Sequence, residues 1–454
     1  MRILIQNGVV VNGDGSKKAD VLIENDAISA VGANLSANGA QVIDAAGCYV
    51  LPGFIDTHTH FDLDVGFTVT ADNFQTGSRA AILGGTTCVL DFATPAREQA
   101  MQDGLDLWHE KARGASCNYG FHMTIARWDE SIKREMRAMA EQGVTSYKMY
   151  MVYDGLKVDD GELYAALREA KQYDALIGVH CENWDVLRRM IVQTKAAGIL
   201  SPMGHALSRP APVEAEAVAR YMRIAQLADA PAYIVHLSTA EGLAEANRAR
   251  ARGQKVYLET CPQYFTLTDD CYDRPDGLKF IMSPPIRKAA DKAAITRALH
   301  DNDIDTIGTD HCSFTMAQKL RGKNDFSMTP NGAAGVQHRG QLLYTLGVCQ
   351  GHIGMEQMVR LLSSNAAALF GMEKHGAIGA GKAADVVIWE PGYETLLTDA
   401  NHAYNCDNTI YAGLSVKGRA RDVILNGRQV VAQGALVAEG TGRYIPRTGC
   451  RALR

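Results

Sequence analysis

Long hydrophobic runs are missing from this chain of 454 residues. No stretch approaches the roughly 20 consecutive apolar residues of a membrane-spanning helix. The chain begins MRILIQNG, and this short apolar start lacks the extended apolar core of a secretion signal. Its ten cysteines include no CxxC pair and no short disulfide-rich frame, which favours reduced thiols. We therefore expect a cytoplasmic protein that does not enter a membrane.

A strong charge of either sign is also missing. The formal net charge is -5, and the sequence contains no block of like charges and no low-complexity tract. This pattern argues against nucleic acid or an acidic membrane surface as a partner. The length and the 46% hydrophobic content allow a large core, sufficient for one α/β barrel and a smaller domain. The expected partner is a small molecule.

The two ends of the chain are both rich in β-strand patterns. Asn7-Gly8 and Asn426-Gly427 each lie between β-branched runs, which is a strong hairpin signal, and Asn25-Asp26 suggests a further hairpin. Another strand is predicted over 385–389. We therefore expect residues 1–50 and 376–440 to build one small β-sandwich domain together, followed by a C-terminal tail over 441–454.

The middle segment, residues 51–375, alternates strand patterns with amphipathic helical patterns. Ser238 or Thr239 is placed to cap one of these helices. The eight predicted strands cover 49–57, 87–92, 119–125, 146–150, 176–179, 233–235, 256–260 and 304–309. This count predicts an α/β fold, a (β/α)8 barrel of the TIM type. A doubly wound open sheet is the alternative, but no GxGxxG follows the first of these strands.

Candidate metal ligands lie at the carboxyl ends of these predicted strands. Because the carboxyl ends of all strands lie on the same face of a barrel, residues far apart in sequence would meet in one pocket. His58 and His60 lie two apart in an extended segment, so both rings can point to the same side. The complete set is His58, His60, Lys148, His180, His236 and Asp310.

Each of these residues also has a purely structural interpretation. An HxH pair is common, and a single histidine at a strand end is more often a hydrogen-bonded core group. Asp310 could cap the following helix, and Lys148 could pair with a buried carboxylate. The metal hypothesis rests on their common position at one end of the barrel.

Lys148 is the most informative member of the set. An ammonium group has no lone pair and would repel a cation, so a lysine must change chemically to take part in metal binding. Reaction with carbon dioxide would give a carbamate, whose two oxygens can bridge two metal ions.

Several segments resemble the dihydropyrimidinase and hydantoinase branch of the amidohydrolases, and the resemblance covers nearly the whole chain. They are PGFIDTHTHFDLDVG from Pro52, GGTT from Gly84, SYKMYMVY from Ser146, VHCEN from Val179, HALSRP from His205, IVHLS from Ile234, ETCPQY from Glu259, MSPPIR from Met282, TDHCSF from Thr309 and PNGAAGV from Pro330.

The resemblance implies a centre of two zinc ions per subunit. His58, His60 and Asp310 would hold one ion, and His180 and His236 the other. N6-carboxylated Lys148 and a hydroxide would bridge both ions. The family hydrolyses the ring amide of dihydropyrimidines or 5-substituted hydantoins. The resemblance also implies a homotetramer.

Roles for three substrate-binding residues also follow from the resemblance. Tyr153 would donate to the developing oxyanion, while main-chain groups of Ser283 and Asn331 would position the amide edge of the ring. The general acid and base would be Asp310, which takes a proton from the attacking water and passes it to the ring nitrogen. Catalysis would therefore combine Asp310 and Tyr153.

Departures from the family pattern concern the choice of substrate. Cys181 and Trp184 stand where the family usually has small residues, which predicts a pocket of different shape near His180; Cys181 should point away from the metals. Phe61, Leu63 and Met151 belong to loops that surround the exocyclic substituent of the substrate in the family. Apolar Phe61 and Leu63 favour an aromatic or alkyl group there, although ordinary loop packing explains these two residues equally well.

Three alternative functions stay open. A dihydroorotase typically has an arginine just after the HxH pair, whereas Phe61 and Asp62 follow His60 here. An allantoinase-type hydrolase of cyclic ureides is less strongly disfavoured. A non-catalytic scaffold of the same fold is disfavoured because all six ligand positions are filled.

Overall fold

Eight parallel strands from the middle of the chain form one sheet in the computed structural model, which describes residues 1–453. Their order is β15-β14-β13-β12-β11-β10-β9-β8. The parallel bridge between Thr59 and His311 brings the two edges of the sheet together and nearly closes the barrel. The strands are β8 (Phe54–Thr59), β9 (Thr86–Ala93), β10 (Asn118–Thr124), β11 (Ser146–Tyr150), β12 (Leu176–His180), β13 (Ala232–Ile234), β14 (Val256–Thr260) and β15 (Thr306–Ile307). The predicted (β/α)8 architecture is confirmed.

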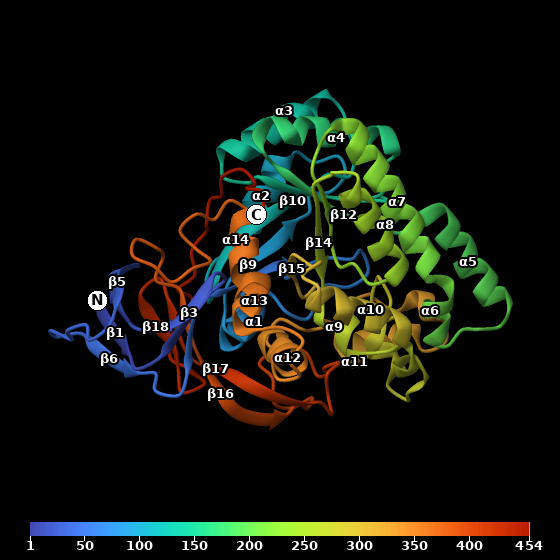
Figure 1. Cartoon of the computed structure of the whole chain (residues 1–454). Coiled ribbons are helices and arrows are strands. Elements are labelled where there is room, and N and C mark those ends of the chain that lie inside the picture. The colour runs from blue at the N-terminus through green and yellow to red at the C-terminus, as the bar shows by residue number, and fades with distance from the viewer. Residues whose placement is uncertain (454) are drawn as a thin grey trace.

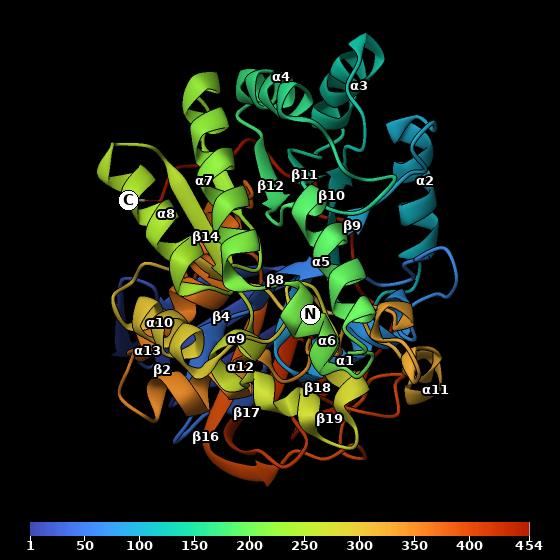
Figure 2. The same cartoon turned by 90° about the vertical axis from the view of Figure 1, so that its right-hand side faces the viewer.

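Helices follow the strands and cover the outside of the barrel (Figures 1 and 2). Side-chain caps fix where several of them begin; the predicted cap Thr239 accepts from the amide of Gly242 at 3.1 Å. The longer helices are α1 (Phe74–Leu83), α2 (Met101–Lys111), α3 (Glu130–Glu141), α4 (Asp160–Ala170), α5 (Trp184–Ala196), α7 (Ala211–Ala228), α8 (Ala240–Ala251) and α10 (Ala289–His300). Shorter helices are α6 (Met203–Ser208), α9 (Pro262–Thr266), α11 (Met316–Lys319), α12 (Arg339–Leu343), α13 (Met355–Val359) and α14 (Asn365–Leu369). Within residues 1–453, no helix has both the length and the apolar character needed to cross a membrane.

Both chain ends contribute to a seven-stranded sheet of order β19-β18-β17-β16-β7-β2-β3. Antiparallel pairing of β7 with β16 joins the N-terminal strands to the C-terminal ones. The members are β2 (Val9–Asn12), β3 (Gly15–Lys18), β7 (Tyr49–Pro52), β16 (Val386–Leu396), β17 (Ser415–Leu425), β18 (Arg428–Ala432) and β19 (Ala435–Leu436). Beside it lies a four-stranded sheet of β5 (Ala27–Gly32), β4 (Asp20–Glu24), β1 (Arg2–Gln6) and β6 (Gln41–Asp44). Figure 1 shows these strands together at one side of the barrel.

Two local expectations are corrected by this pairing. Asn7-Gly8 is no hairpin, because β1 pairs with β4 and β6 whereas β2 pairs with β3 and β7. The predicted strand over 49–57 is two strands, because β7 joins β16 and β8 joins β9. Gly53 lies at the break, where a Cβ atom would be 2.0 Å from Oγ1 of Thr87. The hairpins at Asn25-Asp26 and Asn426-Gly427 are present.

The C-terminal segment runs along the barrel without a helix or strand. Tyr119 in β10 donates its amide to Arg443, and the amide of Ile445 donates back to Tyr119. Arg447 is buried among the barrel strands, where its guanidinium donates to Oγ of Ser146 at 2.7 Å and to the carbonyl of Phe121. The segment therefore anchors the chain end to β10 and β11.

Candidate metal centre and substrate cavity

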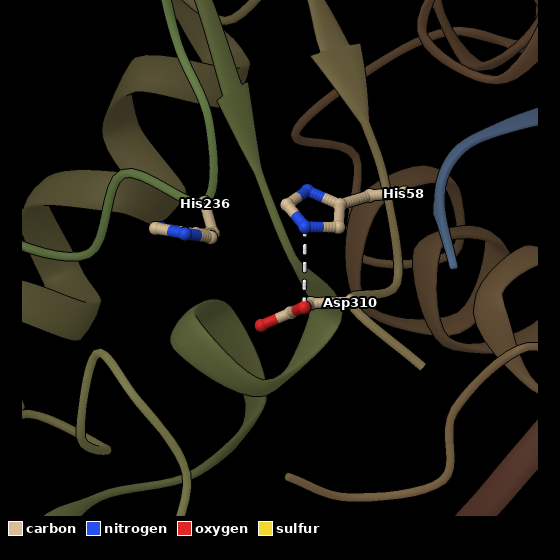
Figure 3. A group of neighbouring side chains, drawn as sticks. All are labelled: His58, His236 and Asp310. Carbon is tan, nitrogen blue, oxygen red and sulfur yellow. Dashed lines mark ion pairs between the residues drawn. The ribbon is translucent and has the colours of Figure 1, made fainter. Parts of the chain in front are cut away.

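The predicted ligands meet at the carboxyl ends of the barrel strands. His58, His236 and Asp310 come from three different segments, yet their ligand atoms lie within 4.8 Å of one another (Figure 3). His60 reaches the same carboxylate, with its Nε2 3.2 Å from Oδ1 of Asp310. The ring of His180 lies 4.4 Å from that of His236. The expected convergence on one side of the barrel is thus present.

Glu259 in β14 fixes the orientation of His58. Burial lowers the pKa of His58 well below its ordinary value, so the ring is neutral and carries one N–H. Its Nδ1 lies 2.7 Å from Oε1 of Glu259 and donates to it. Thr57 and Tyr233 donate to the other oxygen at 2.5 and 2.7 Å. The lone pair of Nε2 on His58 is therefore directed toward Asp310, as a metal ligand requires.

Glu182 orients His180 in the same manner. Its Oε2 accepts from Nε2 of His180 at 2.7 Å and from the guanidinium of Arg209 at 2.7 Å. Burial alone would raise the pKa of Glu182, but Arg209 and His180 lower it far below its usual range. Because Glu182 occupies Nε2 of His180, Nδ1 is the nitrogen left to bind a metal.

Two buried histidine nitrogens support this interpretation. Nε2 of His58 and Nδ1 of His236 make no hydrogen bond to any atom of residues 1–453. Buried nitrogens without partners are costly, and native proteins rarely leave them so. Metal binding at this group of residues would satisfy both nitrogens, because imidazole and carboxylate are zinc ligands. The residues present therefore fit a metal.

Strained backbone occurs at three site residues. Tyr153, His236 and Asp310 have φ angles of 73°, 41° and 53°. These left-handed conformations cost non-glycine residues of order 1–3 kcal/mol each and are typical of functional sites. The surrounding structure therefore directs these side chains at an energetic cost.

Lys148 is fully buried in β11 and reaches the same cavity as the histidines. Burial lowers the pKa of its ammonium to about 8, partly offset by Asp310 and Glu259. A lysine with a lowered pKa has a larger fraction of neutral, nucleophilic amine near neutral pH.

A cavity of 660 Å³ opens above these residues. It is lined by all six predicted metal ligands and by four of the predicted substrate residues, Leu63, Tyr153, Ser283 and Asn331. Burial raises the pKa of the Tyr153 phenol well above its ordinary value, so the hydroxyl keeps its proton. The buried Oγ of Ser283 has no hydrogen-bond partner in the described chain.

Two predicted substrate residues are placed elsewhere. Phe61 is fully buried and packs against Phe74 and His311, with ring centroids 5.5 and 5.4 Å apart. Met151 is buried in the main hydrophobic cluster. Neither residue lines the cavity, and both are buried in the protein interior. Cys181 also points away from the cavity, as expected, and its thiol contacts the carbonyl of Val179.

The sequence analysis linked Trp184 to the shape of the pocket near His180, and Trp184 lines the cavity, where it donates its indole N–H to Asp154 at 2.8 Å. Sequence reasoning did not single out three other residues of the cavity wall, Phe67, Leu156 and Arg97. Glu182 and Glu259 were also missed, although a carboxylate within or directly after a buried strand is a recognisable signal, because such a charge needs partners.

A barrel with a histidine and aspartate metal-binding group at the carboxyl ends of its strands has the architecture of a metal-dependent barrel enzyme. Comparison with known proteins agrees. The model of the Amidohydrolase family matches residues 49–430. A D-hydantoinase of Streptomyces coelicolor is 39% identical over all of this chain and 99% of its own length. A D-phenylhydantoinase of Escherichia coli is 40% identical over 98% of both chains.

A solved structure supports the same relationship. The dihydropyrimidinase from Brevibacillus agri NCHU1002 superposes with a TM-score of 0.98 at 39% identity, over 99% of both chains. The chain therefore belongs to the amidohydrolase family, in its dihydropyrimidinase and D-hydantoinase branch, and is a cyclic amidohydrolase.

Proposed function

We propose that this protein hydrolyses the ring amide of 5-substituted hydantoins, dihydropyrimidines or both, giving N-carbamoyl amino acids. The observation that carries the proposal is the meeting of the six predicted ligands with Tyr153, Ser283 and Asn331 around one cavity. The names of the relatives support the choice of substrate class.

The proposed metal is zinc, two ions per subunit. His58, His60 and Asp310 would hold one ion, and His180 and His236 the other, with carboxylated Lys148 between them. Zinc at this site would polarise the ring carbonyl and lower the pKa of a water molecule toward neutrality.

The chain's own residues would handle the ring and the proton. Water adds to the ring carbonyl carbon, the carbon–nitrogen bond breaks, and a proton must move from the water to the ring nitrogen. Asp310 would carry that proton. The protonated Tyr153 hydroxyl would donate to the oxygen on which negative charge develops. Main-chain groups of Ser283 and Asn331 would hold the amide edge of the ring.

Asp310 offers a direct test of this assignment. Asp310→Asn keeps the size of the side chain but removes the carboxylate, so we expect weak zinc binding and poor turnover. A variant with near-normal kcat would refute the role of Asp310 as proton carrier.

A substrate panel tests the proposal as a whole. We would compare kcat/KM of the zinc-loaded protein for dihydrouracil, hydantoin, both enantiomers of 5-phenylhydantoin, allantoin and dihydroorotate. The proposal predicts the highest values of kcat/KM for dihydrouracil, hydantoin or 5-phenylhydantoin. A clear preference for allantoin would favour an allantoinase-type hydrolase, and no turnover of any ring would favour a scaffold.

We further propose a homotetramer in the cytoplasm. Free thiols at all ten cysteines support a reducing compartment. Val186 and Val192 on α5 and Leu207 on α6 are 47%, 63% and 47% exposed, which supports contact with another subunit. Light scattering would measure the mass of the assembly.

A further inference from the structure

Lys319 at the end of α11 is a buried ammonium with an unusual set of partners. The residue is 1% exposed. Its Nζ donates to the carbonyl oxygens of Ile281, Pro330 and Gly332 at 2.7, 2.8 and 2.6 Å. It forms no ion pair with a carboxylate in residues 1–453, and its Nζ lies 5.5 Å from the centroid of the Phe314 ring. Three main-chain dipoles therefore stabilise this charge.

The three carbonyls flank the residues that line the cavity above the metal centre. Pro330 and Gly332 lie on either side of Asn331, and Ile281 is two residues before Ser283. The amide of Gly332 also donates to the carbonyl of Ile281 at 3.0 Å, so the two segments are joined at the point that Lys319 contacts. A single side chain thus connects both segments.

The chemistry of the contact requires a protonated lysine. Only an ammonium has three hydrogens to donate, whereas a neutral amine has two. Burial lowers the pKa of Lys319 to about 7, against an opposing effect of the Cys312 and Cys406 thiols. Hydrogen bonds to three carbonyl oxygens favour the charged form. A buried charge without an opposite charge is costly, and an apolar side chain could fill the same space. Stability alone is therefore a poor reason for a lysine here.

We propose that Lys319 is a positioning residue that holds the Ser283 and Asn331 segments at the spacing needed to grip the ring amide of the substrate. It does not touch the substrate, and its effect passes through the backbone of these two segments. The inference rests on the proposed function, since it assigns a purpose to the spacing of the segments that would bind the ring.

Lys319→Met tests the inference, because methionine has a similar length and no hydrogen to donate. Lys292→Met is the matched control, since Lys292 also donates to a main-chain carbonyl, that of Thr266 at 2.8 Å, but lies outside the cavity. With the zinc-loaded enzyme and hydantoin, we expect Lys319→Met to raise KM and to lower kcat/KM by about 10- to 100-fold, as a misplacement of the order of 1 Å does. Zinc content should stay at the wild-type level.

A second variant keeps the test decisive if Lys319→Met does not fold. Lys319→Gln retains two donor hydrogens, so we expect a KM between those of the wild type and the methionine variant. An unchanged KM in a folded variant of either kind would overturn the inference.

Amide hydrogen exchange gives a readout that needs no substrate. In Lys319→Met or Lys319→Gln, peptides covering 281–283 and 330–333 should exchange at least about tenfold faster, while peptides containing His58 stay unchanged. Uniformly faster exchange would indicate a general structural role and refute the inference. If the wild type opens no ring, the proposed function fails, and exchange alone decides whether Lys319 orders the two segments.

Discussion

Replacement of Glu259 should weaken metal binding without removing a ligand. Its carboxylate accepts hydrogen bonds from His58, Thr57 and Tyr233, and also from the amide of His236 at 3.2 Å. It thus fixes one ligand ring and the backbone of another. Loss of such an outer partner typically lowers metal affinity 10- to 100-fold, which is about 1.4 to 2.7 kcal/mol.

Two substitutions separate orientation from charge. In Glu259→Gln the amide oxygen can face His58 while its NH₂ group faces the hydroxyls of Thr57 and Tyr233, which can accept as well as donate. The His58 ring keeps its orientation, and metal affinity should fall only about tenfold. Glu259→Ala leaves Nδ1 of His58 without a partner, so metal affinity should fall by about 100-fold.

The assay is competition for zinc between the protein and a chelator of known affinity, with bound metal measured at each chelator concentration. Glu245→Gln is a suitable control, because Glu245 forms an ion pair with Arg248 on the surface of α8. Wild-type zinc affinity in Glu259→Ala would show that this carboxylate does not orient a ligand, and the reasoning would be wrong.

Other residues lead to further predictions. Lys148→Ala should lose most metal and activity and regain part of both with a short carboxylic acid; full activity without the acid would refute the carbamate. Burial lowers the pKa of His205 to about 3, so the folded protein holds the neutral ring. The contribution of this ring to the free energy of unfolding is complete above about pH 6.5 and is lost as pH falls toward 3. Between pH 6.5 and 5 the wild type should lose about 2 kcal/mol more unfolding free energy than His205→Gln, measured by urea unfolding, and parallel curves would disprove this. Arg447→Ala should cost about 3 to 6 kcal/mol of stability through two lost charge-assisted hydrogen bonds. Arg443→Ala, at an exposed ion pair, should cost under about 1 kcal/mol, and equal melting temperatures of the two variants would contradict this.

Much of the barrel could be predicted from the sequence because strand and helix patterns alternate eight times. The same regularity placed His58, Lys148 and His180 on one face, since carboxyl ends of parallel strands share a side of a barrel. Lys148 added chemical information, because an ammonium at a metal site must be modified.

Other features depend on pairing and packing that no local pattern specifies. The run over 49–57 looks like one strand, yet the chain changes sheet at Gly53 because each half pairs with a different partner strand. Phe61 is apolar in a loop next to the site, and only the position of Phe74 shows that it faces the core. The contacts of Glu259 and Lys319 join segments 201 and 38 residues apart, so their roles require the folded chain.

Metal-dependent ring opening is the measurement that tests the central claim most directly. The zinc-loaded protein, the same protein after chelation, and the chelated protein after return of zinc would each be incubated with 5-phenylhydantoin, and the N-carbamoyl product would be quantified by mass spectrometry. We expect product from the zinc-loaded protein, almost none after chelation, and recovery when zinc is restored. Ring opening that survives complete removal of metal, or no product from the fully loaded protein with any ring of the panel, would contradict the account.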